Sequence, residues 1–177
     1  APESDVQESL GLRALWKASP AGVATIGLSG LASAGFFGVG TIYAVKAGLS
    51  VSETALFMTL FIGFGAASQW PLGWLSDKID RRKVILLCCA SVICICIILT
   101  SFEFTSKILL ILSALVGACT LPLYSLGVAQ ANDRLEPKQM ISASGTIVLV
   151  FSVFAALGPL TMSYFLELFE MFGFMLY

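Results

Sequence analysis

Histidine is absent from this chain of 177 residues, and charged residues make up only 12% of it. Without histidine the sequence lacks the commonest general base and the usual nucleophile triads, so we expect no enzyme activity. A soluble domain usually carries about 25% charged residues, whereas 58% of this chain is hydrophobic. The composition therefore excludes an ordinary soluble domain and predicts an integral membrane protein.

Motifs for metals and cofactors are also missing. The five cysteines lie in uncharged stretches, no two of them form a Cys-x-x-Cys motif, and there is no histidine to complete a zinc site. A cysteine in such a stretch behaves as a small apolar residue. We therefore expect no metal, no cofactor and no nucleic acid among the partners of this chain.

Charge is missing from five long stretches, each of which is long enough to be a membrane-spanning helix. A span needs about 20 helical residues to cross a hydrocarbon core of about 30 Å. No stretch alternates as a β-barrel strand would, and lipid offers no partner to an open backbone, so helices are expected. We predict an all-α integral membrane fold with spans at about 21–45, 54–76, 84–102, 108–132 and 138–166.

Two domains follow from this division, a polar lead over 1–19 and a transmembrane helical half-domain over 20–177. The lead is expected to be a cytoplasmic linker, either disordered or folded as a short helix on the membrane surface. The chain does not begin with Met and stops within an apolar run, F-G-F-M-L-Y. We therefore interpret it as a piece of a longer protein, in which a sixth span begins near Phe174 and is cut off.

Local signals mark where several helices begin. Ser19 followed by Pro20 is typical of an N-cap and a first-turn proline. Ser50 and Glu53 have the spacing of a capping box, and Glu136-Pro137 opens the fifth span in a similar way.

Positive charge is distributed unequally between the two sets of alternate loops. Lysine and arginine are retained on the cytoplasmic side of membrane proteins. The N-terminus and loops 77–83 and 133–138 are therefore predicted to be cytoplasmic, in a multi-pass protein of the plasma (bacterial inner) membrane. One side carries eight cations, Arg13, Lys17, Lys78, Arg81, Arg82, Lys83, Arg134 and Lys138, and the other carries two, Lys46 and Lys107.

Small residues recur at helical spacing and would let another helix approach closely. We expect them to serve general helix packing, with passage of a substrate as the alternative. The partner surface of the first set is expected in a part of the protein outside this chain. The sets are Gly30/Ala34/Gly38, Gly63/Ala67 and Ser113/Gly117.

A dense charged loop, G-W-L-S-D-K-I-D-R-R-K at 73–83, separates the second and third spans. It resembles the signature of the major facilitator superfamily, G-x-x-x-D-[RK]-x-G-[RK]-[RK]. Asp80 stands where the family has its second glycine, and five positions match: Gly73, Asp77, Lys78, Arg81 and Arg82.

The resemblance implies a fold in which two halves of six helices form a twelve-helix transporter. The five spans and the clipped sixth fit one half. The polar lead and the form of the loop resemble the C-terminal half of uncharacterised bacterial members, so the spans would be helices seven to eleven; an N-terminal half is the alternative. A-A-L-G-P-L at 155–160 looks like the family's Gly-Pro element, in which Gly158 and Pro159 bend the helix.

The resemblance also assigns a role to the charged loop. Asp77 would hold the two halves together on the cytoplasmic side, and Arg81 and Arg82 would pair with Asp133 or Glu136 in the next cytoplasmic loop. Such pairs would break when the cavity opens inward. The alternative is that the cations of the loop only set the orientation of the chain in the membrane.

Polar residues in the helices that line the family's cavity are candidates for substrate contact, although each could instead make a hydrogen bond between helices. No Asp, Glu, Lys or Arg lies deep in a span, so this half offers no evident site for a coupling ion. Uncharged walls favour a neutral or amphipathic substrate. The candidates are Tyr43, Gln69, Tyr124, Ser125 and Gln130.

The sequence therefore predicts part of a secondary active transporter that moves a small solute by alternating access. Its expected partners are the lipid bilayer, the other half of the same transporter and an unidentified small-molecule substrate. The alternative is a non-transporting membrane scaffold or channel subunit. A membrane-embedded enzyme would need clustered His, Asp or Cys near one interface, and the sequence shows no such cluster.

Overall fold

The computed structural model of the chain describes residues 11–101 and 105–169, and all regular secondary structure within these ranges is α-helical. The sixth span predicted near Phe174 and most of the polar lead lie outside the described residues. The helices are α1 (Leu12–Ala18), α2 (Pro20–Lys46), α3 (Val51–Lys78), α4 (Arg81–Ser101), α5 (Ser106–Thr120), α6 (Pro122–Asn132) and α7 (Pro137–Phe169).

Five helical rods among the described residues are long and apolar enough to cross a membrane, which confirms the predicted five-span all-α fold. Several rods extend beyond the uncharged stretches, as α3 does at Glu53 and Lys78. Charged side chains are tolerated there because long polar side chains reach toward the interface. Dividing the sequence at its charges therefore underestimated the lengths of the helices.

The fourth rod consists of two helices, α5 and α6, a division that the sequence analysis missed. Pro122 begins α6, and proline has no backbone N–H to donate to the carbonyl four residues earlier. That carbonyl belongs to Ala118, and the Ser68 hydroxyl of α3 donates to it at 2.7 Å. A side chain of α3 therefore supplies the hydrogen bond that the proline removes from the α5–α6 rod.

The predicted helix starts are correct, with one difference in how they are stabilised. Pro20 and Pro137 begin α2 and α7, and Ser50 and Glu53 form the capping box of α3. Ser19, however, does not cap α2 with its side chain. Its buried hydroxyl donates instead to the Gln130 carbonyl of α6 at 3.1 Å. The last carbonyls of a helix lack partners within the helix, so Ser19 satisfies α6 and ties it to α2.

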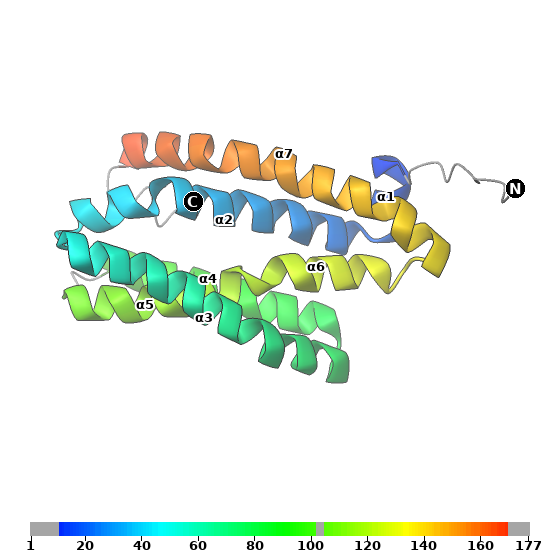
Figure 1. The fold of residues 1–177 in the computed structure, drawn as a ribbon, viewed down its shortest axis with the longest axis horizontal. Coiled ribbons are helices and arrows are strands. Elements are labelled where there is room, and N and C mark those ends of the chain that lie inside the picture. Colours follow the sequence, from blue (N-terminus) through cyan, green and yellow to red (C-terminus); the bar gives the residue numbers. More distant parts are fainter. Residues whose placement is uncertain (1–10, 102–104, 170–177) are drawn as a thin grey trace, which may run out of the picture.

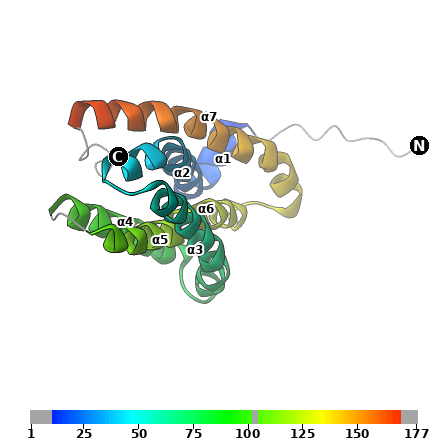
Figure 2. The ribbon, with the colours of Figure 1, turned by 60° about the vertical axis from the view of Figure 1, so that its left-hand side comes forward.

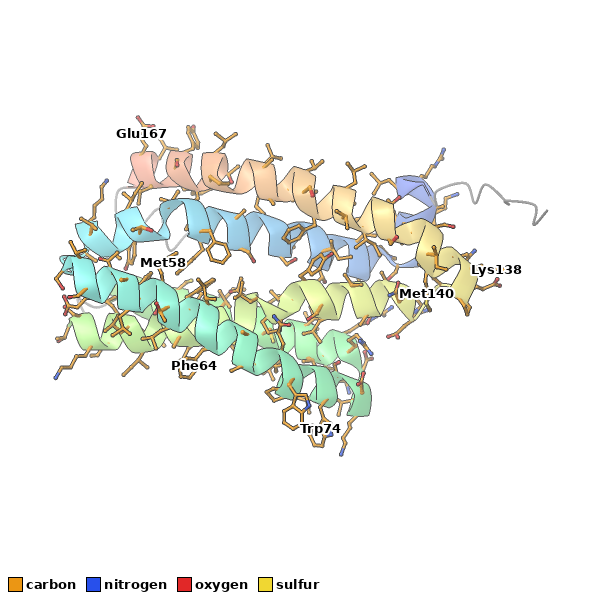
Figure 3. The ribbon with its side chains drawn as sticks, viewed as in Figure 1. Met58, Phe64, Trp74, Lys138, Met140 and Glu167 are labelled. Atoms are coloured by element: carbon orange, nitrogen blue, oxygen red, sulfur yellow. The ribbon has the colours of Figure 1, made fainter. Side chains whose placement is uncertain are left out.

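The helices form two groups that lie side by side (Figure 1). One group is α2 with α7, and the other is α3 with α4 and α5. The helix α6 lies between them and packs against α2 as well as α3 (Figure 2). We call the end that carries α1, the α3–α4 turn and the α6–α7 loop the charged end, and the end with the α2–α3 turn the opposite end. Figure 3 shows Lys138 and Glu167 at these two ends of α7.

Close backbone contact joins α2 to α7. A Cβ atom added to Gly30 would lie 2.6 Å from the Phe151 carbonyl oxygen, and one added to Gly38 would lie 2.9 Å from the Pro159 side chain. A Cβ on Gly158 would lie 2.5 Å from the Leu31 carbonyl oxygen. The expectation that the small residues of α2 have their partner outside this chain is therefore wrong. Sequence spacing locates such a stripe on a helix but does not say which helix covers it.

The other two sets of small residues differ in their surroundings. Ser113 of α5 donates to the Phe57 carbonyl of α3 at 3.2 Å, and Gly117 lies directly against the Phe61 backbone. Gly63 is exposed, and no atom lies within 4 Å of the place where its Cβ would be. The α3–α5 contact therefore uses the small residues of α5, while the Gly63/Ala67 face of α3 points away from the described bundle.

Candidate functional site

The α3–α4 turn at the charged end is short and capped. Ile79 is extended and donates its N–H to the Leu75 carbonyl at 3.1 Å, which ends α3. The Asp80 carboxylate then accepts a hydrogen bond from the Arg82 N–H at 3.0 Å, in the first turn of α4. A carboxylate at a helix N-terminus satisfies a free amide and faces the positive end of the helix dipole. Asp80 therefore has a role of its own at the position where the sequence signature has glycine.

Arg81 lies between the ends of three helices. Its Nη2 atom donates to Asp77 Oδ1 at 3.0 Å, and its Nε atom lies 3.2 Å from Asp133 Oδ2. The second contact is an ion pair by distance but lacks the geometry of a hydrogen bond. The Arg81 side chain is 15% exposed, whereas those of Asp77 and Asp133 are 70% and 51% exposed. One partly buried cation thus connects α3, α4 and the end of α6 through two accessible carboxylates.

A polar pocket of about 460 Å³ lies beside these ion pairs. The α3–α4 turn and the end of α6 meet here, and both contribute residues to its walls. The sequence analysis had not singled out Ser76, Ile79, Asp80 or Arg134 for this surface. The lining residues are Ser76, Asp77, Ile79, Asp80, Arg81, Arg82, Gln130, Asp133 and Arg134.

Three of the predicted site residues do not line the pocket: Gly73 and Lys78 near the α3–α4 turn, and Glu136 in the α6–α7 loop. Lys78 places its ammonium 3.8 Å from the centre of the Trp74 ring, a cation–π contact, and Figure 3 shows Trp74 at this end. Gly73 faces open space. Within the described ranges Glu136 forms no ion pair with Arg81 or Arg82, and its backbone N–H instead bonds the Gln139 side chain at 3.0 Å.

The polar residues predicted to line a substrate cavity do not form one cluster. Tyr43 is buried toward the opposite end, and Gln130 is buried at the charged end. Tyr124 packs edge-on against Phe151, with ring centres 4.7 Å apart. Gln69 and Ser125 are exposed, and the Ser125 hydroxyl bonds its own helix at the Pro122 carbonyl. These side chains differ in their position along the helices and in whether they are buried or exposed, so they form no single site.

Comparison with known proteins decides the family. Residues 22–176 match the family described as Major Facilitator Superfamily. This chain belongs to that superfamily. The match includes the charged turn and all five membrane-length rods, so the resemblance read from residues 73–83 is confirmed. The superfamily member described here is therefore a multi-pass membrane protein.

Curated relatives of this superfamily member carry names of transporters. The chain is 27% identical over 132 residues to an uncharacterised MFS-type transporter of Enterobacter sp. (strain 638). It is 28% identical over 132 residues to the uncharacterised MFS-type transporter YcaD of Escherichia coli O9:H4 (strain HS). Each match covers 75% of this chain and 34% of the relative, so the chain spans about a third of the relatives' length. No solved structure matches the chain.

Proposed function

We propose that this chain is one half of a secondary active transporter that moves a small solute by alternating access. The family match, the transporter names of the relatives and the five membrane-length rods support this function. The observation that carries it is the Arg81 bridge between Asp77 and Asp133 beside a polar pocket. It joins the ends of three helices at one face of the bundle, where a gate between the two halves would act.

The proposed role of Asp77 is to hold the other half when the cavity is closed at the charged end. Arg81 occupies Oδ1 of Asp77, and the side chain remains 70% exposed. An exposed carboxylate oxygen is suited to accept hydrogen bonds from the free amides at the N-terminus of a helix. Arg81 would keep the Asp77 carboxylate aimed outward, and Asp133 would keep Arg81 in place.

The strength of these contacts suits a switch. Arg81 is partly buried but both of its carboxylate partners face water, and ion pairs open to water contribute about 0–1 kcal/mol each. A carboxylate at a helix N-terminus contributes about 0.3–2 kcal/mol. A change of about 1.4 kcal/mol alters a two-state ratio tenfold. The gate is therefore strong enough to shift the balance between two conformations and weak enough to break during each cycle.

The charge distribution supports an orientation with the charged end in the cytoplasm of a bacterial cell. The helix α1 at this end buries Leu15 completely and leaves Leu12 and Trp16 about half exposed. An apolar side chain exposed beside Lys17 is typical of a helix that lies at a membrane surface. We propose that residues 1–19 link the two halves along the cytoplasmic face, which makes this chain the C-terminal half.

The proposed solute is neutral or amphipathic. Charged side chains of the described rods lie near their ends, so the faces between them offer apolar and uncharged polar groups. Gln69 and Ser125 are exposed in this half and would face the cavity between the halves. Their amide and hydroxyl groups would bind a polar group of the solute by hydrogen bonds.

Cysteine accessibility in the full-length protein tests alternating access. Single cysteines replace Arg134, an exposed residue that lines the polar pocket, or Ser52, near the opposite end, after every native cysteine of the protein, including the five of this chain, is changed to alanine. We expect a membrane-impermeant maleimide to reach the two positions from opposite faces of proteoliposomes. A neutral or amphipathic solute from a screened panel should raise labelling at one position and lower it at the other.

Two results would contradict the proposal. Labelling of both positions from the same face would refute the orientation and the half-transporter topology. If both positions are labelled, no solute changes the labelling, and the proteoliposomes leak ions or solute, the protein is a channel subunit.

A further inference from the structure

A second cavity lies inside the bundle, away from the charged end. Its volume is about 120 Å³, and it is lined by side chains from α2, α3, α4, α5 and α7. Every lining residue is buried or half-buried, so the cavity is a recess within the packed helices, partly open at its mouth. It shares no lining residue with the polar pocket of the candidate gate.

Stacked aromatic rings form one wall of this cavity. The Phe36 ring lies 3.7 Å from that of Phe61, at 10° between the planes, and 5.6 Å from that of Phe57 at 13°. The rest of the lining includes Val92 of α4 and Met162 of α7. Flat rings together with flexible aliphatic side chains offer dispersion contacts to an apolar group.

The lining offers no charge to an occupant. No Asp, Glu, Lys or Arg is among its residues. The Ser113 hydroxyl already donates to the carbonyls of Leu110 and Phe57, at 2.8 Å and 3.2 Å. Water is bound in a protein interior when about two to four polar partners surround it. Tyr43 and Thr120 also line the cavity, but almost all of its exposed wall is apolar. These walls therefore favour an uncharged, apolar occupant over water.

The volume sets the size of that occupant. An apolar cavity of about 150 Å³ lined by Leu, Ile and Phe stays dry and binds benzene or xenon. We propose that the cavity lined by Phe36, Phe61 and Val92 binds one uncharged apolar group of about benzene size, such as an aromatic ring or a branched alkyl group. The group comes from a free apolar solute or from the end of a lipid chain. Because it would contact five helices, its binding stabilises their present arrangement.

Xenon under pressure is the first probe, applied to crystals of the full-length protein. We expect one xenon site between Phe61 and Val92 in the parent protein. Val92→Phe fills the cavity and should abolish this site, whereas Val153→Phe, on an exposed face of α7, should leave it unchanged. Ala32→Leu is a smaller filling change that guards against misfolding of Val92→Phe.

Solution binding and labelled lipid complete the test. Benzene should bind the parent protein about tenfold more tightly than either filled variant, measured in one detergent so that partition into micelles cancels. Dibromo acyl chains with bromine density in the cavity would assign the membrane as the source, and xenon density without bromine would assign a free solute. A parent cavity that takes neither probe, or a xenon site that persists in both filled variants, would overturn the proposal.

Discussion

The α2–α7 contact and the charged end differ in what holds them together. Between α2 and α7, glycines allow backbone to lie against backbone, as at Gly30 and Gly158. At the charged end, Arg81 connects helix ends through two carboxylates that are each more than half exposed. Close packing has one arrangement and resists change, because a lost contact is not replaced. Exposed ion pairs exchange with water at little cost. We therefore expect the α2–α7 contact to stay rigid and the charged end to be the face that opens.

The largest effect is expected where a side chain is forced into the α2–α7 contact. Gly158→Ala places a Cβ 2.5 Å from a backbone oxygen of α2, so the helices must move apart. We expect a loss of about 1–3 kcal/mol in the free energy of unfolding, measured by titration with a denaturing detergent. Gly63→Ala is the matched control, because its Cβ meets nothing within 4 Å. It should change stability by no more than about 1 kcal/mol, in the favourable direction. Equal losses in both variants would show that close contact does not hold α2 to α7.

A smaller effect on stability and a larger one on transport are expected at Asp77. Asp77→Asn keeps the size of the side chain and removes the charge that orients toward a helix N-terminus. A shift of about 1.4 kcal/mol would displace the two-state ratio about tenfold, so initial uptake by the full-length protein should fall while expression stays near the parental level. Lys83→Gln, on exposed helix surface outside the pocket lining, should transport close to the parental rate. If Asp77→Asn takes up solute at the parental rate, the charged loop only sets the orientation of the chain in the membrane.

The smallest effect is expected for the Arg81–Asp133 pair. Its coupling energy, from a double-mutant cycle of Arg81→Gln and Asp133→Asn, should be below about 1 kcal/mol in thermal unfolding. A coupling above about 2 kcal/mol would make the charged end a structural clamp, and the contrast with the α2–α7 contact would disappear.

The sequence was sufficient for the parts of the fold that depend on composition along the chain. Uncharged length predicted the five rods, and side-chain chemistry predicted the cap at Ser50 and the helix start at Pro137. It did not reveal which helix covers Gly30, because that depends on the packing of distant segments. The interior cavity was missed for the same reason, since its lining comes from five helices. Pro122 was a visible signal of the α5–α6 division, and the length of the uncharged stretch concealed it.

For the candidate site, the motif located the loop, and the structure located its contacts. Arg81 and Asp133 were already considered as partners, and they lie 3.2 Å apart. The cap made by Asp80 was missed because that residue was read as a departure from the family's glycine. An Asp directly before a helix that begins Arg-Arg-Lys is itself a signal for an N-cap.

The hydrogen bond from Ser68 to Ala118 has a consequence for motion. Because Pro122 has no N–H, the backbone of the α5–α6 rod is complete only while α3 supplies its hydroxyl. Separating the two helices would leave a carbonyl without a partner in a medium that contains no water. We therefore expect α3 and the α5–α6 rod to move as one rigid unit, with bending confined to the helices around them. A proline that would ordinarily loosen a helix here couples that helix to its neighbour.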